Sequence, residues 1–103
     1  MLSPEECQRL AEFMQGFSNP LRVRILCKLR NGERTVGEIA TELGEKQSNV
    51  SQQLAILYHK GYVTRKKHDR HVYYWLRDES LCEIMEQIVR YVLKDNTRTL
   101  KSV

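Results

Sequence analysis

The stretch from Gln47 to Gly61, QSNVSQQLAILYHKG, constrains the fold more than any other part of the chain. At 3.6 residues per turn, Val50, Leu54 and Leu57 fall on one side of a helix. Four amide and hydroxyl side chains collect on another side: Gln47, Ser48, Ser51 and Gln52. No residue from Gln47 to Leu57 is charged, although 29% of the chain is. We therefore predict a helix that packs on one face and offers hydrogen bonds on the other, and Gly61 is placed to end it.

Such a neutral polar face suits the reading of DNA. Amides and short hydroxyls can probe base edges in the major groove without being committed to phosphate. The charge of the whole chain is only modestly positive, +4 from 17 Lys and Arg against 13 Asp and Glu, so its placement matters. Four basic residues lie within six positions after the polar helix: Arg65, Lys66, Lys67 and Arg70. A solvated turn could explain this run, but its position favours contact with DNA phosphate.

Capping signals mark where the earlier helices begin. They occur at three places: Ser3 with Glu6, Asn19 with Pro20, and Thr35 with Glu38. These signals predict helices over about 4–17, from Pro20 to about Asn31, and from Thr35 to Gly44. The uncharged helix begins three residues after Gly44, so residues 35–60 have the arrangement of a helix-turn-helix.

The remaining chain predicts a hairpin and a long helix. Tyr62–Lys67 and His71–Leu76 are rich in β-branched and aromatic residues, and the polar turn between them places the basic run at the tip of a wing over about 62–76. Asp78 caps a last helix, about 79–94, whose apolar face is broad enough for two partners. One partner can be the domain's own core, and the other the same helix or the first helix of a second copy.

The predicted fold is therefore a single domain over residues 1–103, mainly α with a small β-hairpin: a winged helix-turn-helix of about five helices and a two-stranded wing. Cys7, Cys27 and Cys82 are widely spaced and odd in number, which disfavours a disulfide scaffold. The chain has no run of 18 apolar residues and no signal-like start, so we expect a soluble, cytoplasmic protein without membrane contact. No nucleophile, base and orienting group are recognisably spaced, so we predict neither enzyme activity nor a cofactor.

From about Asn19 to about Tyr91 the chain resembles the ArsR/SmtB family of winged-helix repressors. The resemblance is carried by NPLRVRIL, by TVGEIATELG, by SNVSQQLAIL with KGYV after it, and by RHVYYWL. It departs from the family at Glu45 and Lys46, where an apolar residue and Ser are common. The resemblance implies a homodimer built on the first and last helices, which binds an inverted repeat in double-stranded DNA. It also implies that the four polar residues read the groove while the four basic residues lie on the wing.

Relatives of this kind are released from DNA by an inducer, and the metal-binding motifs of metal sensors do not match here. Thr35 and Gly37 stand where a Cys-x-Cys pair would be, and Asp78 with Ser80 where Asp-x-His would be. The resemblance therefore implies neither of the family's familiar metal sites.

Cys27 matches the cysteine that sulfur-sensing relatives carry in the context ILC, but Leu93 stands where their second cysteine would be. Three interpretations stay open. Cys27 is a small buried hydrophobe, or a redox- or persulfide-sensing thiol with Cys7 or Cys82 as its resolving partner, or part of an unusual cysteine site for arsenite or a soft metal. A function of another class, a winged helix that mainly binds protein through its apolar helix faces, also stays open.

Overall fold

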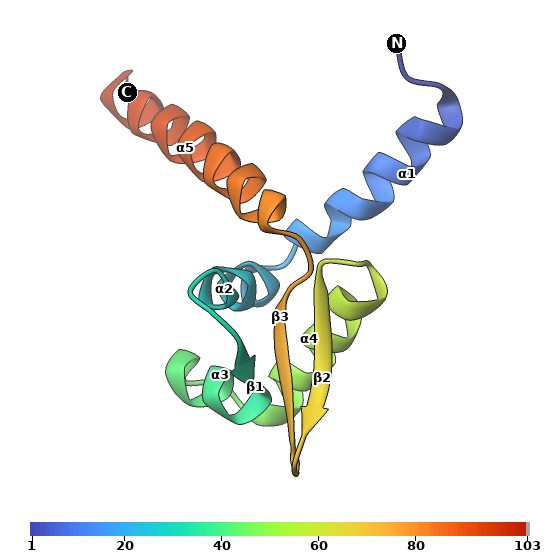
Figure 1. The fold of residues 1–103 in the computed structure, drawn as a ribbon. Coiled ribbons are helices and arrows are strands. Elements are labelled where there is room, and N and C mark those ends of the chain that lie inside the picture. Colours follow the sequence, from blue (N-terminus) through green and yellow to red (C-terminus); the bar gives the residue numbers. More distant parts are fainter. Residues whose placement is uncertain (103) are drawn as a thin grey trace.

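The computed structural model describes the backbone of residues 1–102 and the side chains of residues 1–94. Over this range the fold consists of α-helices, one short 3-10 helix and a small antiparallel sheet (Figure 1). In chain order the elements are α1 (Pro4–Met14), η1 (Gln15–Phe17), α2 (Pro20–Leu29), β1 (Arg34–Thr35), α3 (Val36–Leu43), α4 (Gln47–His59), β2 (Val63–His68), β3 (His71–Leu76) and α5 (Glu79–Ser102). The predicted winged helix-turn-helix is confirmed.

The helix starts follow the predicted capping chemistry. Ser3 Oγ accepts a hydrogen bond from the backbone N–H of Glu6, whose carboxylate accepts in return from the N–H of Ser3. Thr35 and Glu38 repeat this reciprocal pair at the start of α3. Because each pair satisfies two backbone donors that a helix end leaves open, these boundaries were readable from local sequence. Gly44 ends α3 with a left-handed backbone, at φ 66°.

Two helix boundaries differ from the prediction. The first helix was expected to reach residue 17, but its α-helical part ends at Met14 and residues 15–17 form a 3-10 turn. This turn brings the backbone of Gly16 against the ring of Tyr62, an approach that a regular helix with a side chain there would prevent. The last helix was expected to end near residue 94, but α5 runs to Ser102, since no Gly or Pro interrupts it.

The sheet has three strands in the order β1-β3-β2, where a two-stranded wing was predicted. The additional strand is β1, in which Arg34 pairs with Tyr74 and Thr35 with Tyr73. Two residues are too few to produce an alternating pattern, so local sequence did not reveal it. The hairpin itself closes at His68 and His71, which pair directly across a two-residue turn that begins with Asp69 at φ 56°.

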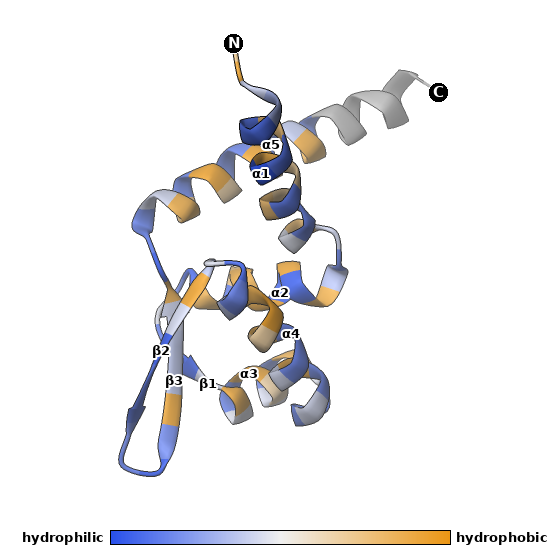
Figure 2. Ribbon diagram, turned by 90° about the vertical axis from the view of Figure 1, so that its right-hand side faces the viewer, coloured by the Kyte–Doolittle hydropathy of each residue, from blue (hydrophilic) through white to orange (hydrophobic). Residues whose placement is uncertain are grey.

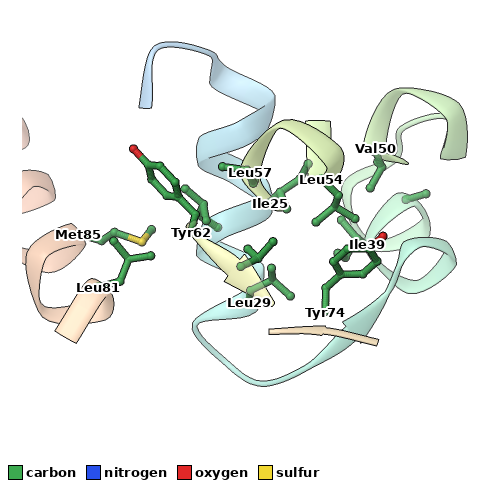
Figure 3. Close-up of a cluster of buried hydrophobic side chains, with 13 residues drawn as sticks. Ile25, Leu29, Ile39, Val50, Leu54, Leu57, Tyr62, Tyr74, Leu81 and Met85 are labelled. Atoms are coloured by element: carbon green, nitrogen blue, oxygen red, sulfur yellow. The ribbon is translucent and has the colours of Figure 1, made fainter. Parts of the chain in front are cut away.

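Figure 3 shows the core, in which every element from α2 to α5 except β1 contributes buried side chains. The buried residues are Ile25, Leu26, Leu29, Ile39, Ala40, Val50, Leu54, Leu57, Tyr62, Val63, Tyr74, Leu81 and Met85. Helix α1 contributes no buried residue. Figures 1 and 2 show α1 and α5 leaving the body at the end opposite the wing tip.

The apolar faces of these two helices are uncovered within one chain. Leu10 and Met14 on α1 and Ile84, Val89 and Val92 on α5 are exposed. Figure 2 shows the corresponding hydrophobic segments along α5. Faces of this kind are sites of association rather than of solvation.

Candidate nucleic-acid interface

Helix α4 separates its packing and polar residues as the sequence predicts. Val50, Leu54 and Leu57 are fully buried against α2 and α3. The four polar residues of the other face are all exposed: Gln47, Ser48, Ser51 and Gln52. The neighbouring Gln53 is half-buried, and its Oε1 accepts a hydrogen bond from Arg22. The exposed face of α4 is therefore a neutral surface of amides and hydroxyls.

The first turn of α4 has no side-chain cap. Lys46 is the N-cap residue, and its carbonyl oxygen accepts from the N–H groups of Asn49 and Val50, both at 3.1 Å. Glu45 turns back to pair with Arg24 at 3.5 Å, and Arg24 also donates to the carbonyl oxygen of Leu43 at 2.8 Å. The departure from the family pattern at residues 45 and 46 therefore leaves the first N–H groups of α4 without a side-chain acceptor.

The basic run divides between the two faces of the wing. Lys66 and Lys67 are paired with Tyr73 and Val72, and successive side chains of a strand point to opposite sides. Arg70 lies in the turn at the tip. Among the side chains that the structure describes, these three cations are exposed and have neither a hydrogen bond nor an ion pair of their own. They are free to meet an external anion.

Arg65 differs from the other basic residues of the wing. Its guanidinium carbon lies 3.9 Å from the centre of the Tyr58 ring, a cation–π contact between the wing and the last turn of α4. The pKa of the Arg65 guanidinium is raised, chiefly by a side-chain hydrogen bond with Tyr74 and to a smaller extent by Tyr58. Arg65 thus holds the wing against α4, a role that the sequence analysis missed because Tyr58 and Arg65 are in different elements.

The connection between α1 and the rest of the body was also missed. Lys60 Nζ donates to the carbonyl oxygen of Glu12 at 3.0 Å, and the Tyr62 hydroxyl donates to that of Phe13. The ring of Tyr62 stacks on Phe13 with centroids 4.2 Å apart. Burial raises the pKa of Tyr62 to about 12. The sequence held one indication of this connection. Arg22 lies in the first turn of α2, where the helix dipole disfavours a cation unless other groups hold it, and its guanidinium donates to the carbonyl oxygens of Gln15 and Gly16.

The three candidate sensor thiols lie in different environments. Cys27 is half-buried on α2 and lines an apolar groove of about 330 Å³ between α2 and α5. Cys82 is half-buried on α5, Cys7 is exposed on α1, and all three are free thiols. At the position of the Asp-x-His motif, Asp78 accepts two hydrogen bonds from Ser80, both at 2.9 Å, which lower its pKa. Among the described side chains, no three His, Cys, Asp or Glu residues form a group that could hold a metal ion.

Comparison with known proteins identifies the family. Residues 19–65 match the family model of the bacterial regulatory proteins of the ArsR family. The regulator NmtR of Mycobacterium tuberculosis is 31% identical over 88 residues, which cover 85% of this chain and 73% of NmtR. The chain belongs to the ArsR family. As an ArsR-family protein it is a winged-helix, DNA-binding regulator of transcription.

Two further proteins similar to this chain are a repressor and a homodimeric domain. The biofilm growth-associated repressor of Xylella fastidiosa is 26% identical over 84 residues, which cover 82% of this chain and 74% of the repressor. The homodimeric winged helix-turn-helix domain of Mb0332 from Mycobacterium bovis superposes with a TM-score of 0.79 at 25% identity, covering 95% of this chain and 93% of that domain.

No helix in the described part of the chain is both long and apolar enough to cross a membrane.

Proposed function

We propose that this protein is a homodimeric repressor that reads an inverted-repeat operator in double-stranded DNA. The observation that carries the proposal is the neutral, exposed face of α4 beside free cations on the wing. In this proposal Gln47, Ser48, Ser51 and Gln52 contact base edges, because amides and hydroxyls can both donate and accept there. Lys66, Lys67 and Arg70 contact phosphate, while Arg65 mainly holds the wing in place. The protein acts where the DNA is, in the cytoplasm.

The uncovered faces of α1 and α5 support the homodimer. Leu10, Met14 and Val92 would be buried if a second copy packed against them. The homodimeric Mb0332 domain, which has the same fold, provides a precedent. A two-fold axis through these helices would bring the two copies of α4 to successive major grooves, about 34 Å apart. The operator would then be an inverted repeat with half-sites about one helical turn apart.

Selection from a pool of randomised duplexes, followed by gel-shift titration at several salt concentrations, tests this function. We expect a two-fold symmetric consensus that is bound at least about 1000-fold more tightly than scrambled DNA. An asymmetric consensus would contradict the inverted repeat, and equal affinity for scrambled DNA would contradict reading by α4. Failure to retain any duplex at physiological salt would instead favour the protein-binding alternative.

Ser51→Ala tests the reading face itself. The variant should tolerate substitution at one base position, losing about 1–3 kcal/mol of discrimination there, while its salt dependence stays unchanged. Thr41→Ala, another exposed hydroxyl of the helix-turn-helix outside α4, should keep the wild-type consensus. An unchanged consensus for Ser51→Ala would place the reading face elsewhere.

For the inducer, we propose a sulfur or oxidant signal that acts through Cys27. The apolar groove beside Cys27 supports this, because a thiol between α2 and α5 can couple its modification to the packing of a dimer helix. Mass spectrometry of protein treated with peroxide or polysulfide, paired with DNA binding, should show loss of binding that follows the Cys27 adduct. Cys27→Ser should abolish the response, and loss of the response in Cys7→Ser or in Cys82→Ser identifies the resolving partner. A full response of Cys27→Ser would contradict the proposal, whereas release by stoichiometric arsenite would favour the soft-metal alternative with Cys82 or Cys7 as further ligands.

A further inference from the structure

The guanidinium of Arg22, in the first turn of α2, is held by four acceptors. Its Nε donates to the carbonyl oxygen of Gly16 at 3.2 Å. Its Nη2 donates to the carbonyl oxygen of Gln15 at 2.9 Å and to the hydroxyl of Ser18 at 3.4 Å. Its Nη1 donates to Oε1 of Gln53, on α4, at 2.8 Å. A single planar group therefore connects the turn η1 to helix α4.

This arrangement depends on the shape of the arginine more than on its charge. All four acceptors are neutral, and among the described side chains no carboxylate pairs with Arg22. The N-terminal end of a helix also carries partial positive charge, which disfavours a cation there. What the position uses is the rigid fork of N–H donors, which can point to several acceptors at once. A lysine of equal charge cannot reproduce that geometry.

The two ends of this connection belong to different parts of the proposed dimer. Residues 15–17 continue α1, whose apolar face is uncovered and is assigned above to the second copy. Gln53 directly follows Gln52 of the reading face but is turned inward toward Arg22. Lys60 and Tyr62, which lie between α4 and β2, also donate hydrogen bonds to carbonyl oxygens of α1. Helices α1 and α4 are thus linked by polar contacts inside each protomer.

We propose that Arg22 is a positioning residue, which sets the placement of α4 relative to the dimer axis and thereby the operator spacing that the repressor accepts. This inference rests on the proposed function. If the connection is rigid, the two recognition helices of a dimer are held at one separation and one rotation about the DNA axis. Inserting a single base pair moves the half-sites by about 3.4 Å and turns them by about 34°. A rigid dimer then loses contacts, whereas a loosened dimer adapts.

The test compares binding to the selected operator with binding to versions in which the central spacer is one base pair longer or shorter. Wild-type protein should bind the altered spacings at least about tenfold more weakly, equivalent to about 1.4 kcal/mol. Arg22→Lys should bind the original operator more weakly and lose most of that spacing preference, while a base substitution within one half-site keeps its wild-type penalty. Arg24→Lys is the matched control, since Arg24 lies on the same helix but contacts Leu43 and Glu45 instead of η1.

A purely structural role for Arg22 would reduce binding to all spacings by the same factor, and that outcome overturns the inference. Gln53→Ala removes only the acceptor on α4 and covers the case in which Arg22→Lys does not fold. It should reduce the spacing preference in the same direction. If Gln53→Ala and every folded Arg22 variant keep the wild-type ratio, the inference is wrong while the proposed function stands. A wild-type protein that binds the selected operator but shows no spacing preference would overturn this inference, whereas loss of the two-fold symmetric consensus would overturn the proposed function.

Discussion

The helix-turn-helix with its wing and the two helices that extend from it differ in how far they bury their leucines. The head, defined as residues 20–76, buries Leu54 completely, whereas Leu10 on α1 is 52% exposed. The arms, α1 and α5, carry as clear an apolar stripe as α4 does. Because hydrophobicity is equal for two leucines, the difference lies in the partner that each one has. The head completes its core with Leu81 and Met85 from the start of α5, whereas the outer apolar faces of the arms have no partner within the described part of the chain.

Leu54→Ala should have the largest effect on the head. Removing this buried side chain should lower the free energy of unfolding by about 2–5 kcal/mol, from lost burial and the cavity left behind. Chemical denaturation at several protein concentrations measures it. Leu10→Ala is the matched control on the arm, and its cost should appear only at concentrations where wild-type protein is dimeric. An equal cost of Leu10→Ala in dilute monomer would break the comparison between head and arms.

Gly16→Ala tests the joint between the two parts. A Cβ at Gly16 would lie 2.3 Å from Cζ of Tyr62, so the stacked ring must move, at a cost of about 1–3 kcal/mol in thermal or urea unfolding. In Gly37→Ala, by contrast, the nearest atom to the new Cβ is Gln47 Nε2 at 3.6 Å. Because Gly37 is inside α3, that variant should gain about 0.5–1 kcal/mol of helix propensity. Equal effects of both substitutions would mean that Tyr62 does not fix the joint.

The phenol of Tyr62 makes the joint sensitive to alkaline pH. Its pKa is raised to about 12 in the folded protein, chiefly by burial, against about 10 in an unfolded chain. Below pH 10 both states keep the proton, so the stabilisation is complete. Between about pH 10 and 12 the unfolded chain releases the proton and the folded protein does not, so stability falls as pH rises.

This loss should be at most about 3 kcal/mol, since a tenfold difference in proton affinity between the two states corresponds to about 1.4 kcal/mol. Unfolding curves between pH 8 and pH 12 measure it. Tyr62→Phe is less stable at neutral pH through loss of the hydrogen bond to Phe13, yet should lack this part of the alkaline decline. Parallel curves for wild type and Tyr62→Phe above pH 10 would show that the phenol titrates alike in both states.

The features that sequence predicted are those encoded within a few residues. Reciprocal capping at Ser3 and Thr35 and the left-handed Gly44 depend on neighbours three to five positions away. The separation of faces on α4 follows from its helical period alone. Contacts between distant elements were missed for the opposite reason. The hydrogen bond from Arg22 to Gln53 joins residues 31 positions apart. Strand β1 is defined by its pairing with β3, in which Arg34 lies opposite Tyr74.

For the wing, the sequence located the basic run but could not distinguish the cation that contacts α4 from those that stay unpaired. Lys66 and Lys67 are adjacent in sequence and lie on opposite faces, which follows from strand geometry once the register is known. The contact of Arg65 with Tyr58 depends on where α4 ends relative to β2. A run of charge therefore indicates a binding surface without indicating which cations remain free.

Lys67→Gln and Arg65→Gln remove the same charge from adjoining parts of the wing and should have the smallest effects, within about 1 kcal/mol at moderate salt. If Lys67 of each protomer neutralises one phosphate, its loss from both copies of the dimer should reduce the slope of log affinity against log salt by about 1.8. If Arg65 is engaged by Tyr58 and Tyr74, its loss should weaken binding by loosening the wing and leave that slope unchanged. Gel-shift titrations at four or more salt concentrations distinguish the two. A reduced slope for Arg65→Gln would show that Arg65 reaches phosphate despite its contacts with the two tyrosines, and the wing would then act as one cationic surface.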